Sequence, residues 1–222
     1  MKPNSPLYCL KRLIVLSLII FLPKLANAQG TLYVSNIQSM GRFPQVSVGS
    51  DAWIAEQIET GDNSSGYVLD SIQLPMGGVG AGASGFTVLV YSDDNNLPST
   101  DLGTLSGSSN PSSGTFTYSA SGLMLAPSTE YFVVATAATP AAQSYDWVGG
   151  NTSSAAGTDQ WTIGGLNLVS SNQGSGWSSF NNGYDMQMAI YATPIPEPSP
   201  WILGLFGSGI ILWRRFSRLH QH

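Results

Sequence analysis

Between residues 29 and 195 the chain has no histidine, cysteine or lysine, since His220, His222 and Cys9 lie near the chain ends. This excludes Ser-His-Asp and Cys-His nucleophiles, Schiff bases and histidine-bound zinc there. Carboxylates remain, and a glycoside hydrolase needs only two of them, ~5–10 Å apart. The candidates are Glu56, Glu59 and Glu130. Each lies near a predicted strand or turn, so we expect exposed edge charges rather than a catalytic pair.

A second candidate chemistry is calcium binding. Asp93, Asp94 and Asn95 place hard oxygen atoms next to one another, and Ca²⁺ prefers such ligands. Asp-Asn clusters are also common in turns, and no EF-hand spacing is present. We therefore expect a turn here and no bound cofactor, with calcium as the alternative.

Three tryptophans could bind sugars. Trp147, Trp161 and Trp177 lie in the loop-rich part of the chain, and exposed rings stack on sugar faces. Trp is largely buried on average, so core packing is the expectation. Carbohydrate binding by an exposed Trp platform is the alternative.

Recurrent strand patterns, separated by Gly, Pro, Asn and Ser clusters, must position these residues. Residues 67–74 and 184–191 alternate between polar and apolar, and the apolar run 130–136 predicts a buried central strand. Further strands are predicted at 52–60, 86–91, 115–118, 123–125, 160–163 and near Ser178. Gly77 to Gly82 predicts a flexible loop between strands. About eight short strands predict an all-β fold over residues 29–193, an antiparallel β-sandwich of jelly-roll type.

Residues 1–28 have the layout of a cleavable signal peptide. A basic start precedes a ten-residue run at 13–22 that is apolar apart from Ser17, and Ala26-Asn27-Ala28 gives the small–x–small pattern before an expected cut at Gln29. Ten helical residues span only ~15 Å, too short for a bilayer core of ~30 Å. We expect a signal helix that signal peptidase removes; an uncleaved anchor is the alternative.

Residues 194–218 have three parts. A Pro-rich segment at 194–199 precedes an apolar run at 201–213, a predicted transmembrane helix, and a basic cluster follows at 214–218. The positive-inside rule keeps this cluster in the cytoplasm while the preceding domain is exported. This layout is that of a processed sorting signal, in which a tail holds the chain until a transpeptidase cuts it.

Pro196-Glu197-Pro198, the apolar run and Arg214-Arg215 together resemble the PEP-CTERM sorting signal. The resemblance covers about 25 residues. It implies a substrate of exosortase, a membrane cysteine transpeptidase of Gram-negative bacteria that make exopolysaccharide. A plain membrane anchor is the alternative.

Residues 52–192 resemble the choice-of-anchor R ectodomain. The resemblance rests on 86–93, on Leu105-Ser106-Gly107 and on 115–134 with Ser121-Gly122-Leu123 and Leu125-Ala126-Pro127. Members of that family carry alternative C-terminal anchors, PEP-CTERM among them. The resemblance supports the fold and assigns no catalytic residue.

Charge separates sharply along the chain. Between residues 29 and 195 a single cation, Arg42, stands against twelve acids. A surface of this kind repels phosphate backbones, which argues against nucleic-acid partners. We expect a non-enzymatic structural protein, membrane-anchored and then displayed on the cell surface or released into exopolysaccharide. Its alternatives are a carbohydrate-binding module, with or without calcium, and a carboxylate-based glycoside hydrolase.

Overall fold

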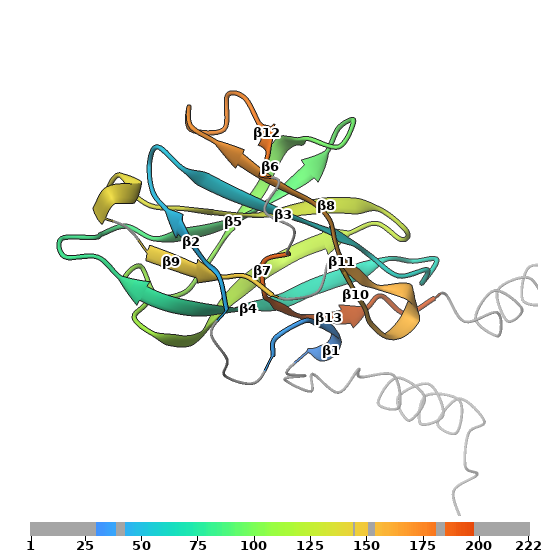
Figure 1. The fold of residues 1–222 in the computed structure, drawn as a ribbon. Coiled ribbons are helices and arrows are strands. Elements are labelled where there is room, and N and C mark those ends of the chain that lie inside the picture. Colours follow the sequence, from blue (N-terminus) through green and yellow to red (C-terminus); the bar gives the residue numbers. More distant parts are fainter. Residues whose placement is uncertain (1–29, 39–42, 144, 151–153, 181–184, 198–222) are drawn as a thin grey trace, which may run out of the picture.

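The structure, a computed structural model, describes residues 30–38, 43–143, 145–150, 154–180 and 185–197 (Figure 1). The predicted signal peptide with Ala26, Ala28 and Gln29 lies outside these residues. So do Pro198, the apolar span 201–213, and Arg214 and Arg215. The described part is an all-β sandwich of two antiparallel sheets. The predicted all-β class and two-sheet sandwich are thus confirmed.

The first sheet has six strands in the order β1-β13-β4-β9-β2, with β7 also paired to β4. Their bounds are β1 Thr31–Ser35, β2 Gln45–Val48, β4 Tyr67–Val79, β7 Gly114–Leu125, β9 Tyr145–Val148 and β13 Ala189–Pro194. β4 is the central strand of this sheet: β7 pairs along one of its edges, while β13 and β9 share the other. Three strands of this sheet therefore pair directly with β4.

The second sheet has seven strands in the order β10-β11-β3-β8-β5-β6, with β12 paired to β11. Their bounds are β3 Trp53–Glu59, β5 Thr87–Asp93, β6 Pro98–Leu105, β8 Glu130–Thr136, β10 Ser154–Ala156, β11 Thr162–Ser170 and β12 Ser178–Ser179. Short 3₁₀ helices at Ala141–Gln143 and Thr158–Gln160 lie in the connections. The chain repeatedly crosses between the sheets, so that strands adjacent in sequence mostly belong to opposite layers.

Alternation along the strands builds the core between the sheets. Ile72, Leu74 and Met76 of β4 point inward and are at most 2% exposed. Ile54 and Ile58 of β3 face them from the second sheet. Tyr33, Tyr67 and Trp161 pack as an aromatic group, with ring centroids 5.0–5.3 Å apart. Each fully buried aliphatic side chain of this kind contributes about 1.5–3 kcal/mol.

The outer face of the second sheet is apolar as well. A second cluster of Ala55, Leu89, Phe132, Val134 and Leu168 lies there, and Trp53, Tyr91, Leu166 and Trp177 pack over it. Both faces of β8 are thus covered, which explains why residues 131–136 are all buried. The prediction of a buried central strand at 130–136 is confirmed.

Three strand predictions need correction. The predicted strands 115–118 and 123–125 are one strand, β7, with an irregularity around Gly122, whose φ is 69°. Gly77 and Gly78 belong to the end of β4 rather than to a loop. The closing strand begins at Ala189 instead of 184, because side chains take the backbone hydrogen bonds just before it: the N–H groups of Met186 and Met188 donate to Glu56 and Asn36.

Candidate functional site

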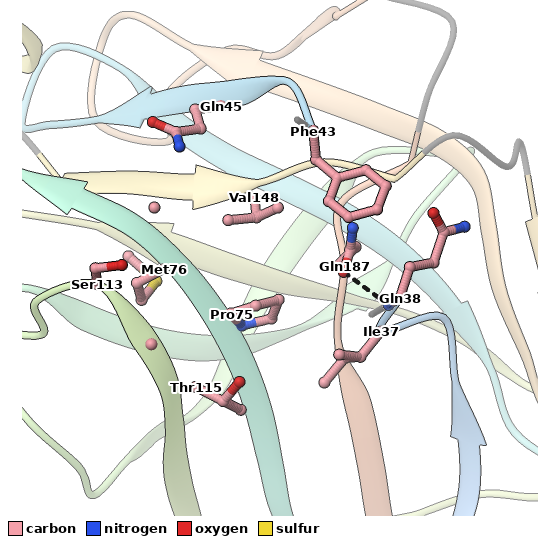
Figure 2. Close-up of a pocket in the computed structure, with 12 residues that line it drawn as sticks. Ile37, Gln38, Phe43, Gln45, Pro75, Met76, Ser113, Thr115, Val148 and Gln187 are labelled. Atoms are coloured by element: carbon pink, nitrogen blue, oxygen red, sulfur yellow. Dashed lines mark hydrogen bonds between the residues drawn. The ribbon is translucent and has the colours of Figure 1, made fainter. Parts of the chain in front are cut away.

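A hollow lies on the outer face of the first sheet, opposite to the core (Figure 2). The inward positions of β4 are Ile72, Leu74 and Met76, so the residues between and after them, such as Pro75 and Gly77, face outward. Thr115 of β7 pairs with Pro75 and lies beside it. β9 and β2 continue the surface with Val148 and Gln45, which are register partners. The floor of the hollow is therefore fixed by strand register.

The segment that follows β1 forms one wall. Asn36 exchanges three hydrogen bonds with the strip at 186–188: its Nδ2 donates to the Met186 carbonyl at 3.0 Å, its N–H donates to the Met188 carbonyl, and its Oδ1 accepts from Met188 N–H at 2.7 Å. These bonds set Ile37 and Gln38 over the sheet. Phe43 completes this wall next to the start of β2 (Figure 2).

Gln187 joins wall and floor. Its Oε1 accepts the Gln38 N–H at 3.0 Å (Figure 2). Its Nε2 donates to the Gly149 carbonyl at 2.9 Å. The side chain is only 1% exposed. Buried polar groups are favourable only when hydrogen-bonded, and here two bonds hold the amide in one orientation. Gln187 is thus a rigid part of the hollow.

Gly77 makes room for another amide. A Cβ at residue 77 would meet the amide group of Gln45. The φ of Gly77 is not in the left-handed region, and Gln45 is an exposed, flexible side chain, so a Cβ would push the amide aside rather than strain the backbone. The Gln45 amide therefore lies against β4 at the edge of the hollow.

The hollow has a volume of about 200 Å³, and none of the described residues that line it is charged. The polar lining consists of amides and hydroxyls, and the apolar lining includes an aromatic and a proline ring: Gln38, Gln45, Gln187, Thr115, Phe43 and Pro75. Such a surface can donate and accept hydrogen bonds and contact apolar groups.

The sequence did not single out these residues. Alternation along 184–191 placed Gln187 opposite the buried methionines. No pattern in the sequence links Gln187 to Gln38 and Phe43, which are about 150 residues away. The pairing arises from the β1–β13 contact, a long-range feature.

The three predicted tryptophans do not form one platform. Trp147 and Trp161 are both 0% exposed. Trp147 donates from Nε1 to the Gln187 carbonyl at 2.8 Å, and Trp161 packs with Tyr33 and Tyr67. Neither ring has a free face for a sugar, so the sugar-binding alternative is wrong for these two. Trp177 is half-buried over the outer cluster of the second sheet.

Glu56 is not the exposed edge charge that the sequence predicted. Its side chain points into the core with Ile54 and Ile58 and is 0% exposed. Its Oε2 accepts the Met186 N–H at 2.8 Å, and its Oε1 has no partner. The carboxyl thus connects β3 of the second sheet to the strip that enters β13 of the first.

Glu56 lies near a second carboxyl. Burial raises the pKa of Glu56 well above its ordinary value; the hydrogen bond from Met186 lowers it, and the charge of Asp185 raises it. Asp185 is 7% exposed, and burial raises its pKa to about 6. Oδ2 of Asp185 has no partner either. Folding therefore makes both carboxyl groups hold their protons to a higher pH than they do in the unfolded chain.

Glu59 and Glu130 are register partners on β3 and β8, so their side chains leave one face of the sheet next to each other. Glu130 is exposed, as predicted, and Glu59 is half-buried. Burial and the charges of Asp93 and Glu59 raise the pKa of Glu130. The pair is adjacent along the sheet, not opposed across the hollow of Figure 2.

Asp93, Asp94 and Asn95 form the predicted turn, between β5 and β6. Asn95 and Asn96 have φ of 56° and 64°, and Asp94 and Leu97 exchange backbone hydrogen bonds. This is a two-residue hairpin, in which Asn tolerates the left-handed conformation. Asn95 Nδ2 donates to Asp94 Oδ1 at 2.7 Å, so turn contacts occupy part of the proposed calcium ligands.

In the part of the chain that the structure describes, no group of three or more His, Cys, Asp or Glu is arranged to hold a metal ion. No helix among the described residues is long and apolar enough to cross a membrane.

Of the sorting motif, Pro196 and Glu197 are described, and both are exposed. Backbone and side-chain contacts fix the segment that leads to them: Ile195 N–H donates to the Gly66 carbonyl at 3.0 Å, and Asn63 Nδ2 donates to the Ile195 carbonyl at 3.2 Å. Ser64 Oγ then donates to Glu197 Oε1 at 2.6 Å. The motif starts directly at the surface of the sandwich.

Comparison with known proteins found no matching family, no matching curated protein and no matching solved structure.

Proposed function

We propose that the chain is an exported structural protein of the cell surface or of an exopolysaccharide matrix, delivered by its C-terminal sorting signal. One observation carries the proposal: Pro196-Glu197-Pro198 precedes an apolar run and Arg214-Arg215 at the chain end, in a chain that also has a signal-peptide pattern. Signal peptidase and exosortase are its processing partners, and the membrane holds it through residues 201–213 until it is processed.

The position of Glu197 supports this role. A transpeptidase can reach the motif only where the chain is accessible, and Pro196 and Glu197 are exposed just beyond the last strand, which ends at Pro194. The contacts of Asn63 and Ser64 keep the motif close to the sandwich. Cleavage near Pro196 to Pro198 would release the β-sandwich with all of its described strands intact.

The strand order supports a jelly-roll type of sandwich. In the first sheet β1, β13, β4 and β7 are neighbours, and in the second β3, β8, β5 and β6 are. Two interleaved Greek keys produce this order. β9 to β12 then extend both sheets between β8 and β13. We infer a scaffold without catalytic activity.

The pocket of Figure 2 favours a second function, carbohydrate binding, because its described lining residues are uncharged and include amides and hydroxyls. The two functions are compatible, since a matrix protein can bind the polymer around it.

Intact mass of the protein from the cell surface and the medium tests the sorting proposal. We expect a chain that starts at Gln29 and ends near Pro196 to Pro198, with or without an added group. Glu197→Ala should leave the tail attached, whereas Ser64→Ala should be processed normally because it removes only the contact that Glu197 makes with the sandwich. A wild-type chain that still ends at His222 and stays in the membrane fraction would overturn the proposal.

A further inference from the structure

We propose that the pocket on the outer face of the first sheet binds a neutral polysaccharide, one sugar ring of which enters the hollow beside Gln45 and Phe43. That this polysaccharide comes from the surrounding matrix rests on the proposed function. The site itself rests on the geometry of the pocket alone.

The lining points to a neutral polyhydroxylated ligand. Gln38 and Gln45 supply amide donors and acceptors, and Thr115 supplies a hydroxyl. The buried Gln187 amide is already bonded to Gln38 and Gly149 and only holds the wall in place. Phe43 and Pro75 supply apolar surface of the kind that contacts the C–H face of a sugar ring. Among the lining residues that the structure describes, none carries a charge with which to pair an anion or a cation. Specific pockets typically combine a few such polar groups with apolar walls.

The size of the hollow limits what enters it. Its volume of about 200 Å³ is below the roughly 300–1,000 Å³ of pockets that take drug-sized ligands. One hexose ring, or the end of a chain, suits this space better than an extended oligosaccharide does.

The surface beside the pocket indicates that the ligand is a polymer. Two residues along β4 from Pro75, the next outward-facing residue is Gln73, whose register partners are Thr117 and Ala189. Two residues further along is Ser71, whose register partners are Ser119 and Tyr191. We call these two rows of residues across the sheet the β4 strip. The strip is polar, uncharged and accessible at Thr117 and Ser119, with a half-buried tyrosine.

Rows of residues that lie two positions apart along a strand are separated by about 6.6 Å. The β4 strip therefore extends the pocket by about 13 Å along the sheet. A sugar chain that starts in the hollow meets hydroxyls, amides and one aromatic ring along this path. A free monosaccharide would use only the hollow.

Binding of immobilised full-length protein in detergent to dextran, mannan and mixed-linkage β-glucan tests the proposal, with anionic alginate as the charged comparison. We expect at least one neutral polymer to bind and alginate not to bind. Gly77→Ala should weaken binding about fivefold, because its Cβ displaces the Gln45 amide and costs one neutral hydrogen bond. Gln45→Ala should have a similar effect.

Ser47→Ala is the matched control, since Ser47 lies two residues along the same face of β2 and contacts Asp146 instead of the pocket. It should bind as the wild type does. The monosaccharide unit of a polymer that binds should bind more weakly than the polymer if the β4 strip takes part in binding.

The proposal is overturned if none of the three neutral polymers binds, if alginate binds as tightly as they do, or if Gly77→Ala and Gln45→Ala bind like the Ser47→Ala control. Its failure is distinguishable from failure of the sorting proposal. If the chain ends near Pro196 to Pro198 but binds no polymer, only the binding-site proposal fails. If the chain binds a polymer but retains His222, only the sorting proposal fails.

Discussion

The outer faces of the two sheets differ in what covers them. The first sheet presents outward hydroxyls and amides, and Ile37, Gln38 and Phe43 stand beside a hollow over it. The second sheet presents Leu89, Phe132 and Val134 outward, and the chain's own Trp53 and Trp177 pack over them. One layer therefore keeps an outer surface for other molecules, whereas the other closes its outer surface with its own side chains.

The difference shows that side chains of a sandwich can be buried on the outer face of a sheet as well as on the face toward the core. A sheet with an apolar outer face needs a cover, and here Trp177, in the connection between β11 and β12, and Trp53, at the start of β3, help to supply it. A sheet with a polar outer face needs none and can carry a binding site. Two experiments test how far this contrast holds, and a third tests a polar group in the core between the sheets.

The largest effect is expected at Phe132, which is 0% exposed although it faces outward from the second sheet. Phe132→Ala should lower the free energy of unfolding by about 3–5 kcal/mol, the cost of a core truncation. Thr117→Ala, on the outer face of the first sheet, should change it by less than about 0.5 kcal/mol. Urea unfolding of both variants measures the contrast. Equal effects would show that the two outer faces do not differ energetically.

Glu56→Gln should stabilise the protein by roughly 1–3 kcal/mol near pH 7, because an unpaired buried carboxyl oxygen is costly, more so when ionised. The folded pKa is raised above the ordinary 4.5, so the unfolded chain ionises first and stability is lost as pH rises above about 4.5. The advantage of the variant should therefore vanish in acid. Urea midpoints of both proteins between pH 4 and pH 8 measure this.

Asp185 should contribute a dependence of the same sign between its ordinary 3.8 and its folded value of about 6. A gain from Glu56→Gln that is independent of pH would contradict the account of Glu56.

The smallest effect is expected at Trp177, which is half-buried over the second cluster. Trp177→Ala should lower stability by about 1–2 kcal/mol, less than a fully buried aromatic, and should increase binding of a dye that reports exposed apolar surface. Ser179→Ala, an exposed change on β12, is the control. Unchanged dye binding in Trp177→Ala would show that Trp177 is not the cover we infer.

Local patterns predicted the strands well where one face is polar or where a run is long and apolar. β3, β8 and most of β4 follow from alternation or from β-branched content. β1, β2, β6, β9 and β10 were missed. They are short or rich in Ser, Thr and Asp, and β1 and β2 are stabilised by pairing with the distant strands β13 and β9 more than by propensity.

The pocket and the burial of Glu56 could not be predicted from local sequence. Glu56 occupies an inward position of a strand whose neighbours are apolar, and only the closing segment at Met186 explains its environment. The pocket likewise depends on Gln38 and Gln187 meeting. Both features arise where the two ends of the domain come together, and periodicity along one segment carries no information about such contacts.

The placement of β13 has a mechanical consequence. β13 lies between β1 and β4, paired antiparallel to both, and the proposed attachment point follows it by a few residues. A pull on the tail along the strand loads the backbone hydrogen bonds on both edges of β13 at once, so they must break together rather than one after another. A sandwich attached through its last strand in this way therefore resists unfolding when its tail is pulled.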